Sequence, residues 1–300
     1  MKNESCFVSN TEKLVTVGSW EPRFWLGFQQ LAATHVLSEV FMYFYAEYAG
    51  VSQPNRQSVR DYCEARQIEL HEQKLAFSAP IDTWRTLYTT MSEAGLSNQS
   101  VLVDITTMPR EAIWILFDLL DTRNNRIRWL YYKPERYNTD WLSRDPGRPR
   151  FIPKMGGITE LGFPTRLLAL SGFDTERTKQ LIMFYEPELI LLGVQCGSQF
   201  DNVTKNIEGH AEEFGRDAIV SLFEVDAYSQ DQGYAVIAAK IEEHLGTSNL
   251  VMASLGPKPS AVALYRIHRE HPHTSLAYAP SKEFNPDYSY GLGDCIIGDL

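Results

Sequence analysis

The sequence predicts an α/β protein built from two tandem Rossmann-like units, each a doubly wound parallel sheet, related by internal duplication. Three observations lead to this fold class: apolar runs of strand length alternate with segments of helical period, the same order of segments occurs twice, and single residues recur with that order. Strands that are apolar throughout are typical of a parallel sheet with helices on both faces. The right-handed crossover between parallel strands makes each sheet doubly wound.

The first half of the chain alternates five expected strands with four expected helices. Its first strand, 13–17, ends at Gly18, and apolar residues recur at helical spacing in 82–93. The other expected strands are 40–45, 69–77, 101–105 and 127–132, and the other expected helices begin near residue 23 or cover 55–66 and 111–120.

The same order begins again in the second half. The expected strands are 166–170, 189–194, 218–225, 250–253 and 274–278, and the expected helices are 175–185, 202–214, 233–245 and 260–269. A polar, Pro- and Gly-rich stretch with four basic residues separates the halves, and it is either an interdomain linker or a basic flap over a ligand. We therefore expect a first Rossmann-like half at 1–140, a linker or flap at 141–160, and a second half at 161–300.

Residues at the end of the first strand recur in both halves. Gly18 and Gly172 each follow that strand, at an offset of 172 − 18 = 154 positions, and Arg23 then falls on Arg177. Both halves thus carry Gly-x-x-x-x-Arg at the start of the first helix. This recurrence favours duplication over two generic α/β halves that coincide.

Two further segments repeat in the same order. Residues 101–116 align with 249–264 at an offset of 148, which places Arg110 on Lys258, and Tyr-x-Pro at 132–134 recurs at 278–280. Each match alone is short, but their shared order supports the duplication.

Composition excludes several classes of function. The net charge is -10, from 28 Lys and Arg against 38 Asp and Glu, which argues against an extended nucleic-acid surface. A small anionic ligand remains compatible, because helix N-termini bind anions on acidic proteins as well. The four cysteines lack any CxxC spacing, and there is no signal-peptide pattern and no apolar run of membrane-spanning length. We expect a cytoplasmic protein with free thiols and no membrane contact.

Chemistry is expected where strands end, because ligands of open parallel sheets bind at the carboxyl ends of the strands. The segment Asp104-Ile-Thr106-Thr107-Met-Pro-Arg110 lies at such an end. Threonine hydroxyls and Arg110 at a helix start suit an anion, and Asp104 suits a hydroxyl or a base edge. The alternative is helix capping together with a surface arginine.

The counterpart in the second half is Ser254-Leu-Gly256-Pro-Lys258. Gly256 permits a close backbone approach. Lys258 begins a helix, where the macrodipole disfavours a cation unless an anion lies in front of it. The alternative for Lys258 is a surface lysine after a turn.

Arg23 and Arg177 also lie at helix starts, so they are candidate phosphate contacts. Alternatively, each pairs with a nearby carboxylate and locks the fold, and the nearby carboxylates are Glu21, Asp174 and Glu176.

Neither half contains a GxGxxG or Walker A motif, so we expect no dinucleotide cofactor. His268, His271 and His273 lie close together, but no cysteine or carboxylate set completes a metal site, so we predict no metal.

An expected strand ending in Asp104-Ile-Thr-Thr, followed by a basic residue that begins a helix, resembles the ligand-binding segment of the CARF domains of CRISPR systems. Two such units in one chain resemble the SAVED domains of bacterial anti-phage systems. The resemblance implies a cyclic oligonucleotide signal bound between two Rossmann-like halves. In this sequence Thr107-Met108 replaces the usual glycine pair.

The leading hypothesis is a sensor that binds a nucleotide or cyclic oligonucleotide in the cleft between the halves and acts with a separate effector protein. Its expected ligand contacts are Arg23, Asp104, Thr106, Thr107, Arg110, Arg177, Ser254, Gly256 and Lys258. Two alternatives stay open: a nucleotide-processing hydrolase with Glu21 or Asp104 as acid/base, and a scaffold subunit of a defence complex.

Overall fold

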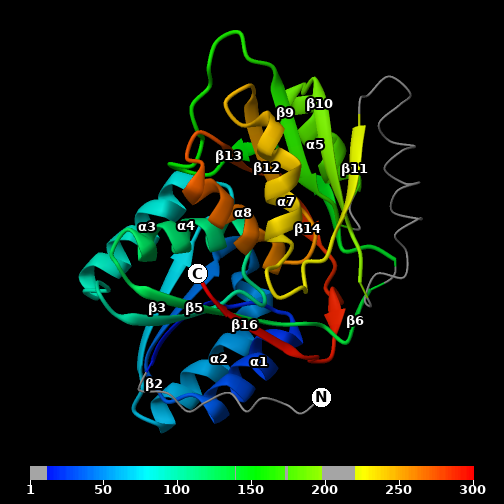
Figure 1. The fold of residues 1–300 in the computed structure, drawn as a ribbon. Coiled ribbons are helices and arrows are strands. Elements are labelled where there is room, and N and C mark those ends of the chain that lie inside the picture. Colours follow the sequence, from blue (N-terminus) through cyan, green and yellow to red (C-terminus); the bar gives the residue numbers. More distant parts are fainter. Residues whose placement is uncertain (1–11, 139, 173–174, 198–219) are drawn as a thin grey trace. The chain divides into compact units, whose positions relative to one another are not determined.

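The computed structural model describes residues 12–138, 140–172, 175–197 and 220–300 (Figure 1). The chain forms two compact units. The first comprises residues 1–138 together with Pro286–Leu300, and the second comprises residues 139–285. Each unit has its own sheet, and each is described by itself.

The sheet of the first unit has six strands in the order β16-β5-β4-β1-β2-β3. These strands are β1 (Glu12–Val17), β2 (Leu37–Tyr45), β3 (Glu69–Leu75), β4 (Ser100–Asp104), β5 (Arg126–Tyr132) and β16 (Cys295–Asp299). All neighbours are parallel except β16, which pairs antiparallel with β5. A two-stranded ladder of β6 (Arg136–Tyr137) and β15 (Ser289–Tyr290) completes the unit.

Helices cover both faces of this sheet (Figure 1). They are α1 (Pro22–Thr34), α2 (Ala49–Ala65), α3 (Pro80–Glu93) and α4 (Arg110–Asp121), with a short 3-10 helix at Ala46–Tyr48. One core cluster joins α1 and α2 to the strands through buried residues such as Phe24, Phe28, Val59, Val40 and Leu102. Alternate strand residues face the other way, which is why the strands read as apolar throughout.

The sheet of the second unit has the order β11-β10-β9-β12-β13-β8. These strands are β8 (Arg150–Phe151), β9 (Thr165–Leu170), β10 (Leu189–Gln195), β11 (Val220–Val225), β12 (Asn249–Ser254) and β13 (Ser275–Tyr278). The described helices are α5 (Thr175–Tyr185), α7 (Tyr234–Ile241) and α8 (Pro259–Glu270), with a 3-10 turn at Glu242–His244. The helix expected at 202–214 lies outside the described residues.

The two sheets have the same strand order. In each unit the five parallel strands, numbered along the chain, lie in the order 3-2-1-4-5, and a short antiparallel strand is added beside the fifth of them. This order is that of a Rossmann-type doubly wound sheet. The α/β fold class is therefore confirmed. Unrelated α/β units also adopt this order, so the duplication itself stays a prediction.

The ends of the two units differ from the expected boundaries. Residues 141–160 are more than a linker, because β7 (Ser143–Pro146) pairs with β14 (Ser281–Phe284) and β8 pairs with β13. The chain then returns, so that Pro286–Leu300 adds β15 and β16 to the first unit. These strands have two to five residues, which is too short for periodicity to indicate a partner.

Two helical glycines provide a test of packing in the first unit. Gly27 lies buried in α1, where a Cβ would come within 2.9 Å of the Tyr132 ring on β5, whereas a Cβ on Gly50 in α2 would meet nothing within 4 Å. Gly→Ala favours a helix by up to about 1 kcal/mol. Crowding in a packed core costs about 1–3 kcal/mol.

We expect Gly27→Ala to lower the free energy of unfolding and Gly50→Ala to leave it unchanged or raise it. Urea unfolding followed by far-ultraviolet circular dichroism measures both. Equal shifts in the two variants would show that the contact with Tyr132 does not constrain α1.

Candidate functional site

The predicted site residues lie at the carboxyl ends of the strands, as expected for a doubly wound sheet. In the first unit they follow β1 and β4, and in the second unit they follow β9 and β12. We call the carboxyl ends of the strands in each sheet its carboxyl edge. The two carboxyl edges differ in how many of their polar side chains have hydrogen-bond partners among the described residues.

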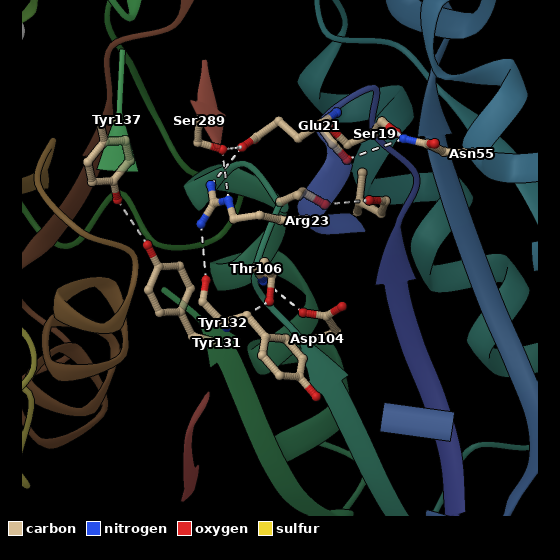
Figure 2. Close-up of polar contacts among 12 residues, drawn as sticks. Ser19, Glu21, Arg23, Asn55, Asp104, Thr106, Tyr131, Tyr132, Tyr137 and Ser289 are labelled. Atoms are coloured by element: carbon tan, nitrogen blue, oxygen red, sulfur yellow. Dashed lines mark hydrogen bonds and ion pairs between the residues drawn. The ribbon is translucent and has the colours of Figure 1, made fainter. Parts of the chain in front are cut away.

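Arg23 is the most enclosed of the predicted basic residues, at 1% exposure in the first turn of α1. Its guanidinium donates three hydrogen bonds (Figure 2): to Glu21 Oε2 at 2.6 Å, to the Tyr132 carbonyl at 3.0 Å and to Ser289 Oγ at 2.9 Å. Ser289 Oγ in turn donates to Glu21 Oε2 at 2.7 Å. These contacts join α1 to the end of β5 and to β15.

The electrostatics of this cluster are those of a closed ion pair. Burial opposes the charge of Arg23, but the neighbouring Glu21 carboxylate, together with Tyr131 and Tyr137, holds the pKa of Arg23 well above its usual value. Glu21, also buried, accepts bonds from two side chains. The sequence left two roles open for Arg23, phosphate contact and pairing with a nearby carboxylate. The observed contacts are those of the second role, with Glu21 as the carboxylate.

The side chains of the Asp104–Thr107 segment bond to backbone groups of the segment itself and of neighbouring strands. Asp104 Oδ1 accepts from the Thr106 amide at 2.8 Å, and Thr106 Oγ1 accepts from the Tyr132 amide at 3.0 Å (Figure 2). Thr107 Oγ1 donates to the Val17 carbonyl at 3.1 Å. The segment therefore ties β4 to β5 and β1. Arg110 is the half-buried first residue of α4, whose N-cap, Pro109, makes no side-chain cap bond.

The loop between β1 and α1 is held in the same way. The Asn55 amide of α2 donates to the carbonyls of Ser19 and Glu21 at 3.0 and 3.2 Å (Figure 2). A Cβ on Gly18 would come within 2.8 Å of the Arg56 side chain, so a larger residue here would force Arg56 to shift. Many of the polar side chains at this edge thus already form hydrogen bonds within the first unit.

Arg177 takes the same position in the second unit as Arg23 in the first. It is 5% exposed, and its Nε donates to the Ala279 carbonyl at 2.7 Å, just after β13. Its guanidinium also lies 5.6 Å from the centre of the Tyr278 ring. In both units the recurring arginine ties the first helix to the end of the fifth strand. Asp174, one of its expected partners, lies outside the described residues.

The Ser254–Lys258 segment turns from β12 into α8. Ser254 Oγ, buried at the strand end, bonds Ser260 Oγ at 3.0 Å, and Ser260 Oγ donates to the Pro257 carbonyl at 2.7 Å. Lys258 is half-buried at the N-cap of α8. The positive end of this helix and the lysine therefore lie together at the edge of the second sheet.

Glycines bring two loops of this edge into backbone contact. A Cβ on Gly256 would come within 2.6 Å of the Ser171 carbonyl and 2.8 Å of Gln195 Nε2, and a Cβ on Gly172 would collide with the Leu255 carbonyl. The expected close approach at Gly256 is therefore present, and the groups that approach are the backbone after β9 and the amide of Gln195.

Two residues missing from the predicted site are the most unusual feature of this edge. Ser171 directly follows β9 and Gln195 is the last residue of β10, and both are 0% exposed. Within the described residues, Ser171 Oγ and both amide atoms of Gln195 have no hydrogen-bond partner. Buried polar atoms without partners are rare, and each requires an explanation such as a bound water or ligand. The sequence signal that could have identified Ser171 and Gln195 is a polar residue at the end of an apolar strand.

A separate cavity of about 260 Å³ lies near the amino ends of β9 and β12. Its lining includes Glu160, Phe163, Asn249, His271 and His273. None of the predicted site residues lines it. The Asn249 amide already donates to the carbonyls of Glu160 and Phe163.

Neither models of known protein families nor curated proteins match this sequence. Over the described residues, no helix combines the length and the apolarity needed to cross a membrane.

The buried pair of Arg23 and Glu21 predicts a large effect on stability. Arg23→Ala leaves Glu21 buried without its cation, and breaking a buried pair costs about 3–5 kcal/mol. Arg85→Ala is the matched control, because Arg85 and Asp82 pair at 3.2 Å with both side chains more than 60% exposed, where a pair contributes at most about 1 kcal/mol.

Thermal and urea unfolding of the two variants measures the difference. An Arg23→Ala variant as stable as Arg85→Ala would rule out a fold-locking role for Arg23.

Proposed function

We propose that this protein is a sensor of a small nucleotide-type anion and that the carboxyl edge of the second sheet contributes the decisive ligand contacts. The observation that carries the proposal is the set of three fully enclosed polar atoms that have no hydrogen-bond partner among the described residues, Ser171 Oγ and the two amide atoms of Gln195.

Leaving these atoms without hydrogen bonds is unfavourable. A buried donor or acceptor without a partner costs about 1–3 kcal/mol. A ligand that supplies both a donor and an acceptor removes that cost at Gln195. The edge of a nucleobase has this pattern, and glutamine amides pair with adenine in this way in other proteins.

The same edge suits the charge of a phosphate. Lys258 and the N-terminus of α8 are both positive, and together they favour an anion at this edge. Ser254, Gly256 and Lys258 remain the proposed phosphate side of the site. Arg177 and Arg23 are assigned instead to holding the two edges in place, through the carbonyls that they contact.

The contacts of the candidate acid/base groups favour binding over hydrolysis. Glu21 is bonded to Arg23 and Ser289, and Asp104 is bonded to the Thr106 amide. A general acid or base must instead reach a substrate proton. The resemblance to CARF and SAVED domains extends the proposal to a cyclic oligonucleotide signal, a role in anti-phage defence and a separate effector protein as partner.

Replacing Gln195 separates binding from folding. Gln195→Met keeps the approximate volume and removes the amide, so we expect stability without ligand to be unchanged or higher. We expect the affinity for the ligand to fall by at least about tenfold, because two hydrogen bonds are lost. Isothermal titration calorimetry with ATP, cyclic di-AMP and cyclic triadenylate measures the affinity, and thermal unfolding measures the stability.

Asn125→Leu is the matched control. Asn125 is a buried amide whose atoms are bonded to Leu96, Leu120 and Gln99, so its loss should destabilise the protein and leave binding intact. The absence of heat with all three probes at millimolar concentration would disprove the proposal. Equal affinities of wild type and Gln195→Met would remove Gln195 from the site.

A further inference from the structure

A group of three metal-ligating side chains lies on the first sheet, away from the carboxyl edge. Of the residues described, Glu39 of β2 and Glu69 and His71 of β3 offer ligand atoms that all lie within 4.8 Å of one another. The parallel register sets Glu39 beside Glu69 and Phe41 beside His71. Because alternate residues of a strand share a face, the three side chains project from the same side of the sheet.

The spacing of these atoms fits a small divalent ion. His71 Nε2 lies 3.4 Å from Glu69 Oε1 and 3.7 Å from Glu39 Oε2. Bonds of about 2.0–2.1 Å in a tetrahedral zinc site separate neighbouring ligand atoms by about 3.3 Å. A small adjustment of side chains thus brings all three ligands onto one ion.

His71 Nε2 is the atom that a metal would use. It is buried, and within the described residues it has no hydrogen-bond partner. The imidazole stacks on Phe41, with ring centres 4.5 Å apart and planes inclined by 10°. This stacking fixes the ring so that Nε2 faces the two carboxylates. Ligands held on strands are also more precisely placed than ligands on loops.

The charges around the group favour a cation. Lys13 Nζ lies 2.6 Å from Glu39 Oε1, which leaves Glu39 Oε2 to face His71. Two carboxylates and one ammonium sum to −2 + 1 = −1, so the group retains a negative charge for an incoming ion. The Glu69 side chain is 67% exposed, which gives the ion a route from solvent.

We propose that Glu39, Glu69 and His71 form a binding site for a first-row divalent transition metal ion, with Zn²⁺ as the best fit. The imidazole ligand selects against Mg²⁺ and Ca²⁺, which prefer oxygen ligands alone. Three protein ligands leave a fourth position for water. This proposal does not rest on the proposed nucleotide site, because its three residues belong to the first unit, whereas Ser171 and Gln195 belong to the second.

The test uses the full chain after treatment with a chelator. Calorimetric titration with ZnCl₂ should show one bound ion, and Co²⁺ should give the intense visible absorption of a tetrahedral complex. The variants are His71→Ala and Glu69→Gln. The control is His271→Ala with His273→Ala, which removes two of the three histidines that lie close together in the second half of the chain.

We expect each ligand variant to weaken Zn²⁺ binding by at least about tenfold, because even outer contacts of metal ligands contribute 10- to 100-fold in affinity. The control should bind Zn²⁺ as wild type does. No binding to wild type at millimolar Zn²⁺, or undiminished binding by His71→Ala, would overturn the proposal and leave His71 as an ion-pair partner of the two glutamates. If His71→Ala fails to fold by circular dichroism, the exposed Glu69→Gln variant decides.

Discussion

The buried guanidinium of Arg23 is the interaction on which the first unit depends. It meets the Glu21 carboxylate, the carbonyl that ends β5 and the Ser289 hydroxyl of β15, so one side chain joins the first helix, the fifth strand and the C-terminal segment. A buried charge is tolerated only where its partners are all present. Arg177 makes the matching bond from α5 to the carbonyl after β13. Recurrence of an arginine at a helix start therefore reflects a requirement of the fold before any requirement of a ligand.

The two sheets differ in how many polar groups at their carboxyl edges have hydrogen-bond partners among the described residues. The first unit closes its edge with bonds among Asp104, Thr106, Thr107 and the strands beside them. The second unit encloses the Gln195 amide and the Ser171 hydroxyl without described partners, beside a helix N-terminus that bears Lys258. Two units of one topology thus differ in how many of their polar groups have described partners at the carboxyl edge. Glu39, Glu69 and His71 form a separate polar group on β2 and β3 of the first sheet.

Much of the fold was predictable, because parallel strands buried on both faces appear as continuous apolar runs. The short antiparallel strands β8 and β16 were missed, since a strand of two to five residues with partly exposed side chains has no such pattern. The sequence placed the candidate residues at the carboxyl ends of strands, but it did not indicate which of their polar groups are hydrogen-bonded. Thr106 and Thr107 were expected to cap a helix or bond an anion. Their hydroxyls instead bond backbone groups at the ends of β5 and β1. A polar residue at a strand end reads the same in the sequence whether or not its hydrogen bonds are satisfied.

The sequence by itself determined the alternation of strands and helices, the acidic charge, and the glycines and arginines at the strand ends, because these follow from local composition and spacing. Only the tertiary structure decided which polar groups are already bonded. Glu21 and Ser289 lie 268 positions apart in the chain. The amide of Gln195 lies close to Gly256 because β10 and β12 flank β9 in the sheet, so that the residues after these strands reach the same edge. The same holds for Glu39 and His71, which the register of two parallel strands brings together. Hydrogen bonding and metal ligation depend on distances of a few ångströms, and those distances are set by packing between segments remote in sequence.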